Sequence, residues 1–146
     1  MFYEFILNSY FDNNLKHFNQ NLTMKTTKII YWVTTGIISL FALNALGMNS
    51  EQTVKSLAHL GIPRYLGFEV SIGQLIGGLI LIIPAIPARI KEWAYVAYGI
   101  VYITAAIAHI SVGDPIGHTI MAVVFFGLLL VSYTSFHKLQ AAKANA

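Results

Sequence analysis

The stretch that decides the fold is PIGHTIMAVVFFGLLLVSYTSF, residues 115–136, which contains no Asp, Glu, Lys or Arg. Three further apolar runs of similar length occupy residues 29–48, 65–86 and 93–112. Each is close to the ~20 residues that a helix needs to cross the hydrocarbon core of a bilayer. Runs this long without alternation exclude strands, and in lipid only helices and closed barrels satisfy every backbone polar group. The sequence therefore predicts an all-α, integral membrane four-helix bundle.

The composition independently indicates a membrane solvent. Hydrophobic residues make up 56% of the 146 residues and charged residues only 10%, whereas a soluble domain carries roughly 25% charged residues. The chain has no cysteine, which excludes thiol redox relays and thiolate-bound iron–sulfur clusters. The formal charge of +3 does not indicate nucleic-acid binding, because the basic residues lie near the predicted helix ends and form no patch.

Residues 1–23 differ from the rest of the chain because they are rich in Asn, Phe and Tyr. Met24 then opens MKTTK directly before an apolar run, as membrane proteins often start. We interpret residues 1–23 as a leader outside the native protein. The alternative is an interfacial amphipathic helix whose apolar residues share one face. The four-helix domain is expected to span residues 24–146.

Basic residues near the helix ends predict how the chain is oriented in the membrane. Only Lys55 and Arg64 flank the helices on one side. The opposite side carries Lys16, Lys25, Lys28, Arg89, Lys91, Lys138 and Lys143. Because cytoplasmic loops carry the excess of positive charge, both termini are expected on the cytoplasmic side. The membrane is expected to be a bacterial inner membrane.

The two outer loops carry signals for the start and end of helices. The first loop is expected to hold a short amphipathic helix, capped by Asn49 with Gln52 at its third position and ended by Gly61. In the second loop, we interpret Asp114 as the N-cap of the fourth helix and Pro115 as its first helical residue.

Four stretches resemble the DoxX-like family of small bacterial membrane proteins. They are MKTTKIIYWVTTGIISLFAL, HLGIPRYLG, LIIPAIPARIKEWAYVAYGI and AHISVGDPIGH, and the resemblance runs from residue 24 to about residue 138. It implies a four-helix transmembrane bundle, with residues 1–23 outside the usual extent of the family. For some members it implies an association with thiosulfate:quinone oxidoreductase or with membrane redox complexes, so it strengthens fold and location more than chemistry.

Glu69 is the sharpest single candidate for a functional residue. A charge at the centre of a membrane helix costs roughly 2.5–3.5 kcal/mol on insertion scales, so such residues are functional candidates. Four-residue spacing places Glu69 on the face of Gly73 and Gly77, and this small-residue pattern lets a neighbouring helix approach closely. We therefore expect Glu69 to point into the bundle. The alternative is an interfacial carboxylate that is solvated or paired with Arg64.

The predicted topology brings several titratable residues to the outer leaflet. They are His59, Arg64, Glu69, His109, Asp114 and His118. Such a cluster could exchange protons, hold the head group of a quinone or bind a metal ion. We predict no metal site, because no His-x-x-x-His or comparable ligand spacing is present. For Asp114 the capping role alone suffices, and His59 is expected at the water interface.

A polar-aromatic stripe follows the third predicted helix. Its members are Tyr95, Tyr98, Tyr102 and His109. The hydroxyls of Tyr98 and Tyr102 need partners in hydrocarbon, which Gln74 or the polar residues Thr34, Thr35, Ser39 and Asn44 of the first helix can supply. Two interpretations stay open. These bonds only hold the helices together, or the stripe lines an outward-facing cavity for a flat ring, closed inward by Phe125 and Phe126.

Two functional hypotheses follow from these features. The first is an accessory or quinone-facing subunit of a membrane redox system, with a quinone as candidate cofactor and an oxidoreductase as partner. The alternative is a non-enzymatic membrane scaffold, or a carrier of a small lipophilic molecule, in which the chain can form a homo-oligomer. Transport is less favoured, because four helices offer little evidence of inverted repeats or of a paired broken-helix site, although a dimer could supply them. The sequence carries no cofactor motif, so catalysis itself is not predicted.

Overall fold

The computed structural model describes the backbone of residues 2–144 and the side chains of residue 15 and residues 22–144. Within this part the chain is all-helical: α1 (Phe2–Ala42), the 3-10 helix η1 (Leu43–Gly47), α2 (Glu51–His59), α3 (Arg64–Ile82), α4 (Ala88–Ser111) and α5 (Ile116–Ala144). The segments long and apolar enough to cross a membrane are Leu22–Gly47, Arg64–Ile82, Ala88–Ser111 and Ile116–Ala144. The prediction of an all-α membrane bundle with four spanning helices is confirmed.

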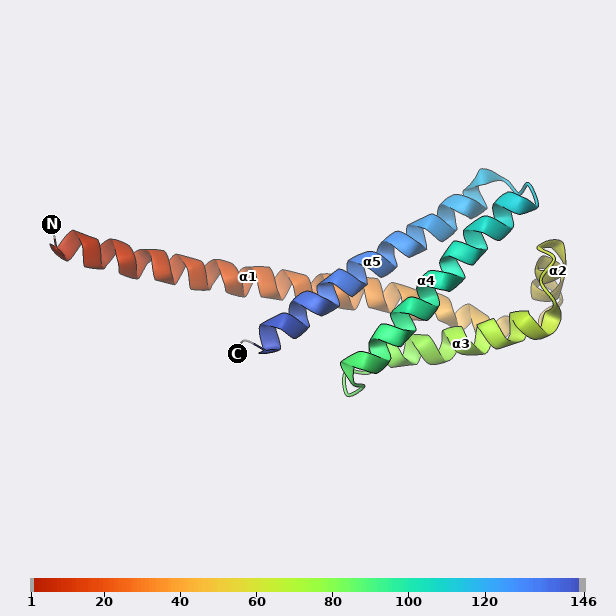
Figure 1. The fold of residues 1–146 in the computed structure, drawn as a ribbon, viewed down its shortest axis with the longest axis horizontal. Coiled ribbons are helices and arrows are strands. Elements are labelled where there is room, and N and C mark those ends of the chain that lie inside the picture. The colour runs from red at the N-terminus through yellow and green to blue at the C-terminus, as the bar shows by residue number, and fades with distance from the viewer. Residues whose placement is uncertain (1, 145–146) are drawn as a thin grey trace.

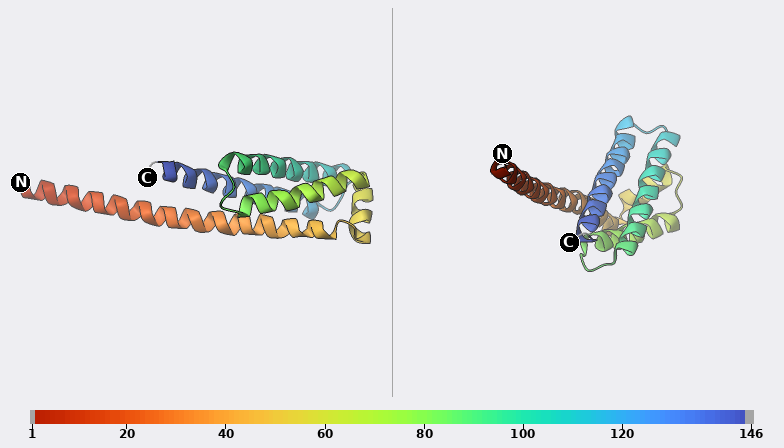
Figure 2. Two further views of the ribbon diagram at one scale, coloured as in Figure 1. Left: turned by 90° about the horizontal axis from the view of Figure 1, so that it is seen from below. Right: turned by 60° about the vertical axis from the view of Figure 1, so that its left-hand side comes forward.

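The four long helices close a ring in which each packs on two neighbours. Both α1 and α4 pack on α3 and on α5. In Figure 1 the α4–α5 hairpin crosses α1 and α3 at an angle. Both chain ends lie toward one end of the bundle, and α1 extends beyond it (Figure 2). We name this the basic end, and we name the opposite end, with α2 and the α4–α5 turn, the histidine end.

Two helix boundaries differ from the prediction for reasons that the sequence contains. α1 begins at Phe2 rather than near residue 29 and crosses Met24 without a break, because residues 2–28 contain no Pro or Gly to stop it. α3 ends at Ile82 rather than at residue 86. Ile83 precedes Pro84, and the proline ring pushes its backbone into an extended conformation with φ −78° and ψ 117°.

The last two helices also extend beyond their predicted bounds at the basic end, whereas at the other end α4 stops at Ser111 and α5 begins one residue after the predicted Pro115. α4 begins at Ala88, directly after Pro87, so the charged residues that we assigned to a loop form its first turns. α5 begins at Ile116 and continues past residue 136 to Ala144. Both helices thus continue through charged residues beyond their apolar runs. The predicted boundaries differ because they followed the apolar runs alone.

The short helix predicted in the first loop is present as α2, but Ser50 rather than Asn49 caps it. The Ser50 hydroxyl accepts a hydrogen bond from the Thr53 N–H at 3.2 Å. At the other end Gly61 adopts φ +68°, a conformation that glycine reaches without steric cost. The Ile62 N–H donates to the Leu57 carbonyl at 2.9 Å, which completes a Schellman motif.

Hydroxyl groups join three helices in the half of the core nearer the basic end. Thr35 of α1 and Ser132 of α5 are fully buried, and their hydroxyl oxygens lie 2.7 Å apart. The Tyr95 hydroxyl of α4 lies 2.8 Å from the same Ser132 oxygen. Since lipid gives no hydrophobic driving force between helices, such bonds and close packing hold a membrane bundle together. We name these three residues the hydroxyl knot.

Gly77 and Gly78, rather than Gly73 and Gly77, let α3 approach its neighbours. A Cβ on Gly77 would lie 2.8 Å from the Tyr98 ring, and one on Gly78 would lie 3.2 Å from the Ala42 Cβ. Gly73 is exposed and a Cβ there would meet nothing within 4 Å. Because each four-residue step turns roughly 40° around an α-helix, the face shared by residues 69, 73 and 77 rotates away from the core.

This difference between the two glycines gives a matched test. We expect Gly77→Leu to lower the free energy of unfolding by about 1–3 kcal/mol, because its side chain overpacks against the Tyr98 ring. Gly73→Leu should stay within about 0.5 kcal/mol of the parent. Unfolding by dodecyl sulfate titration in mixed micelles measures both. Equal destabilisation by the two substitutions would contradict this assignment of the packing face.

The side of the membrane on which each end lies is a prediction that labelling can check. The chain has no cysteine, so Ser56→Cys in α2 and Ala141→Cys near the end of α5 each give one reactive thiol at an exposed position. A membrane-impermeant maleimide should label Ser56→Cys in intact spheroplasts and Ala141→Cys only after lysis. The reverse pattern would place both termini outside the cytoplasm.

Candidate functional site

Asp114 is positioned at the histidine end by the way α4 stops. Gly113 adopts φ +73°, and its N–H donates to the Ile110 carbonyl at 3.2 Å. The Asp114 N–H donates to the His109 carbonyl at 3.1 Å. This second Schellman motif turns the chain back over the last turn of α4. It brings the Asp114 carboxylate beside the His109 ring.

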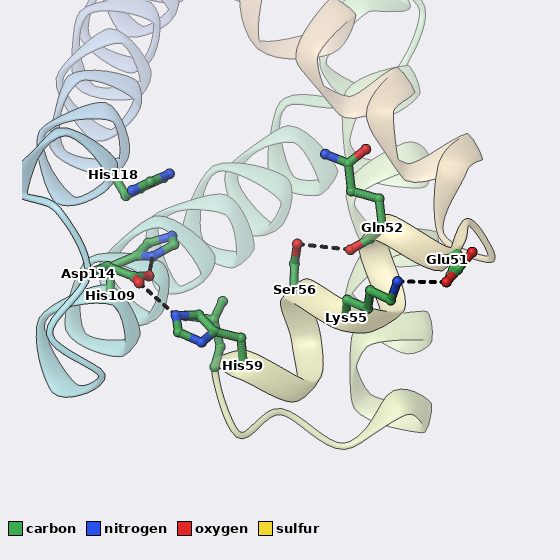
Figure 3. Close-up of a pocket in the computed structure, with 9 residues that line it drawn as sticks. Glu51, Gln52, Lys55, Ser56, His59, His109, Asp114 and His118 are labelled. Carbon is green, nitrogen blue, oxygen red and sulfur yellow. Dashed lines mark hydrogen bonds and ion pairs between the residues drawn. The ribbon is translucent and has the colours of Figure 1, made fainter.

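The Asp114 carboxylate holds one histidine with each oxygen. His109 Nδ1 lies 2.6 Å from Oδ2, and Nε2 of His59, the last residue of α2, lies 2.7 Å from Oδ1 (Figure 3). Because an ionised carboxylate only accepts hydrogen bonds, both of these nitrogens carry the proton. For a neutral His109 the other nitrogen, Nε2, is then an acceptor. We name this arrangement the carboxylate clasp.

The clasp corrects our interpretation of Asp114 as a helix cap. α5 begins at Ile116, and both Asp114 oxygens bond to histidines rather than to the first N–H groups of α5. Hydrogen bonds from His109 and then His59 lower the pKa of Asp114 below its ordinary value of 3.8. The carboxylate is therefore ionised at neutral pH. The contribution of the ionised Asp114 carboxylate to stability is fully present at a pH above its ordinary pKa. It is lost as the pH falls through the lowered pKa.

His118 lies in the first turn of α5 and completes the cluster. Its ring stacks on that of His109, with centroids 5.2 Å apart and planes 22° apart. Together with the clasp and with residues of α2, the two rings line a hollow of about 680 Å³, the histidine pocket (Figure 3). Among the described residues no three His, Cys, Asp or Glu side chains are placed to hold a metal ion.

A second hollow, of about 510 Å³, lies next to the histidine pocket and is lined by residues of α1, α3, α4 and α5. We name it the Tyr102 cavity, and its lining includes Phe41, Gln74, Tyr102, His109, His118 and Phe125. His109 and His118 line both hollows, so they form the wall between them. The structure thus brings five of the predicted site residues together: Gln74 and Tyr102 in the cavity, His109 and His118 in its wall, and Asp114 behind His109.

Tyr102 differs from the other tyrosines of its stripe. Its side chain is only 4% exposed, and its hydroxyl has no hydrogen-bond partner among the described residues. The Tyr98 hydroxyl donates to the backbone carbonyl of Gln74 at 2.6 Å, and Tyr95 belongs to the hydroxyl knot. A buried hydroxyl without a partner costs about 1–3 kcal/mol. The unpartnered hydroxyl belongs to a side chain that lines the Tyr102 cavity.

Glu69 does not belong to this cluster, so the expectation that it points into the bundle is wrong. Its side chain is exposed, and it lines a separate hollow on α3 with Arg64 and Phe68. The reason is the rotation that also turns Gly73 outward. Phe125 lines the Tyr102 cavity as expected, whereas Phe126 lies near Gly99 of α4 instead.

Sequence reasoning missed Lys91, which we counted as a loop charge. The residue lies in α4 and is only 3% exposed. It continues the stripe of Tyr95, Tyr98 and Tyr102 by one further turn, at the same spacings of three and four. This spacing is the signal that could have placed Lys91 inside the bundle.

The sequence also matches the model of a known protein family. That family is the DoxX-like family, and the match covers residues 30–132, well over half of the chain. The chain belongs to the DoxX-like family. The matched part of this DoxX-like protein contains the carboxylate clasp, the Tyr102 cavity and the hydroxyl knot, and it leaves out residues 1–23. Curated proteins and solved structures gave no match.

The two buried tyrosines Tyr95 and Tyr102 should respond in opposite ways to the loss of a hydroxyl. Tyr95→Phe removes a bond to Ser132 and should lower the unfolding free energy by about 0.5–1.5 kcal/mol. Tyr102→Phe removes an unpartnered group and should leave stability unchanged or raise it. Dodecyl sulfate unfolding in mixed micelles measures both. Equal losses would show that the Tyr102 hydroxyl has a partner within the protein.

Proposed function

We propose that this DoxX-like protein binds a flat lipophilic ring, such as that of a quinone, in the Tyr102 cavity, as an accessory subunit of a membrane redox system. One observation carries the proposal. The Tyr102 hydroxyl is buried and lacks a partner among the described residues, and the Tyr102 side chain lines a cavity of about 510 Å³. A phenolic hydroxyl donates readily to a carbonyl oxygen of such a ring.

The walls of the cavity support an aromatic ligand. The Phe125 ring lies 5.7 Å from that of Tyr102 and 4.2 Å from that of Phe41, measured between centroids. Aromatic pairs favour offset or tilted packing at such separations. A binding site for a small molecule typically combines walls of this kind with a few polar groups that fix orientation. Tyr102 and Gln74 supply those groups here.

The histidine wall supports exchange of protons with water. Reduction of a quinone to its quinol consumes two electrons and two protons. His109 and His118 line both the cavity and the exposed histidine pocket, and imidazole gains and loses protons near neutral pH. Asp114 fixes the ring orientation of His109 through Nδ1. Because the sequence has no cysteine and no cofactor motif, we assign the electrons to an oxidoreductase partner.

The alternative is a carrier that binds a lipophilic molecule without chemistry, and the same cavity favours it. Most of the lining is aromatic or aliphatic, including Val101, Ala105 and Met121. A carrier needs the cavity but has no use for a proton-exchanging wall. His109→Gln therefore distinguishes the two hypotheses, provided that the variant retains its ligand affinity. A redox subunit predicts slower quinone reduction by membranes that contain this variant, and a carrier predicts an unchanged rate.

Binding of a short-chain ubiquinone to the full chain in phosphatidylcholine nanodiscs tests the proposal. We expect saturable binding that Tyr102→Phe weakens about two- to tenfold, the effect of one lost hydrogen bond. Ala105→Phe should abolish binding by filling the cavity. A photoreactive quinone should cross-link to α4 and α5, near Met121.

The matched control is Tyr133→Phe, because Tyr133 lies on α5 outside the cavity and packs against Tyr95. Its quinone affinity should equal that of the parent. Non-saturable binding, or equal affinity in the parent, Tyr102→Phe and Ala105→Phe, would overturn the proposed function.

A further inference from the structure

A fourth hollow, of about 650 Å³, lies at the basic end, far along the bundle from the Tyr102 cavity. Lysines from three places in the chain converge on it: Lys25 and Lys28 of α1, Lys91 of α4 and Lys143 of α5. No carboxylate stands among the described residues that line it. We name it the lysine pocket. Its concentration of positive charge has no negative counterpart within its own walls.

Lys91 is the buried member of this pocket. Its Nζ donates to the Leu81 carbonyl at 2.9 Å and to the Tyr31 hydroxyl at 3.3 Å. The Leu81 carbonyl is available because α3 ends at Ile82, and the last carbonyls of a helix lack partners within it. Lys91 therefore caps α3, but both partners are neutral. In the part of the chain that the structure describes, its ammonium group makes no ion pair.

A buried ammonium without an opposite charge is costly, and an anion in the pocket would offset that cost. The capping role explains why Lys91 contacts Leu81. The rule for cytoplasmic positive charge places Lys25, Lys28 and Lys143 at this end, but it does not offset the repulsion between like charges that line the same hollow. An anionic group held among the four lysines would offset both this repulsion and the cost of burying Lys91.

Most of the remaining walls of the pocket are apolar. They include Trp32, Ile86, Phe136 and Leu139. Trp32 remains partly exposed, as tryptophans commonly are where hydrocarbon meets the head-group region of a bilayer. An apolar wall beside four lysines suits an amphipathic ligand that has an anionic head group and an apolar chain. A free inorganic anion would gain nothing from this wall.

We propose that the lysine pocket binds the phosphodiester group of an anionic phospholipid, with the glycerol and upper acyl chain against the apolar wall. Basic pockets between membrane helices bind anionic lipid head groups through the same chemistry. The proposal concerns the basic end and does not depend on the function proposed for the Tyr102 cavity. The lipid would tie α1, α4 and α5 together where α3 ends.

Native mass spectrometry of the full chain in a neutral detergent tests this site. Phosphatidylglycerol or phosphatidylcholine is added at equal concentration, so that the two lipids differ in head-group charge but share the phosphodiester. We expect phosphatidylglycerol to be retained and phosphatidylcholine to be retained at least fivefold less. Inorganic phosphate at millimolar concentration should not displace phosphatidylglycerol. Displacement by inorganic phosphate would show a simple anion site and would overturn the assignment to a lipid.

Two variants and one control locate the binding. Lys28→Gln and Lys91→Gln should each weaken phosphatidylglycerol binding about fivefold. Lys28 is exposed on α1, so its variant keeps the test valid if Lys91→Gln fails to fold. Lys138→Gln makes the same change in net charge on exposed α5 surface outside the pocket and should bind as the parent does. Equal retention by Lys28→Gln and Lys138→Gln would contradict the proposal.

Discussion

The hydroxyl knot of Thr35, Tyr95 and Ser132 is the interaction on which the bundle depends. Within lipid each helix already satisfies its own backbone, so only side chains can fix one helix against another. The knot joins α1, α4 and α5 at one point, and Gly77 and Gly78 bring α3 against the same core. Most fully buried side chains therefore gather in this half of the molecule. The Tyr102 cavity lies in the other half of the bundle, toward the histidine end.

The two ends of the bundle thus carry different chemistry on a shared frame. At the basic end α3 stops early because of Pro84, and Lys91 and Tyr31 both donate to its Leu81 carbonyl beside other lysines. At the histidine end two glycine turns stop α2 and α4, and they bring His59 and Asp114 within hydrogen-bond distance. In both places the end of a helix, rather than its middle, positions the polar groups.

Local and periodic features could be predicted from the sequence, and long-range contacts could not. The four spanning helices, the short α2 ended by Gly61 and the stripe of Tyr98 and Tyr102 follow from run length, glycine chemistry and helical spacing. The role of Asp114 depends on His59, which lies 55 residues earlier in the chain, and local capping rules therefore gave the wrong partner. For Glu69 the error was geometric. Residues four apart lie close together on a helix, but over two such steps, from Gly77 to Glu69, the side chain turns away from the core.

The carboxylate clasp also has a consequence for access to the interior. His59 is largely open to water, and water competes with a single exposed hydrogen bond. The clasp can therefore break without disturbing the knot at the other half of the core. Parting of α2 from the α4–α5 turn would then widen the histidine pocket, which shares His109 and His118 with the Tyr102 cavity, without the unfolding of any helix.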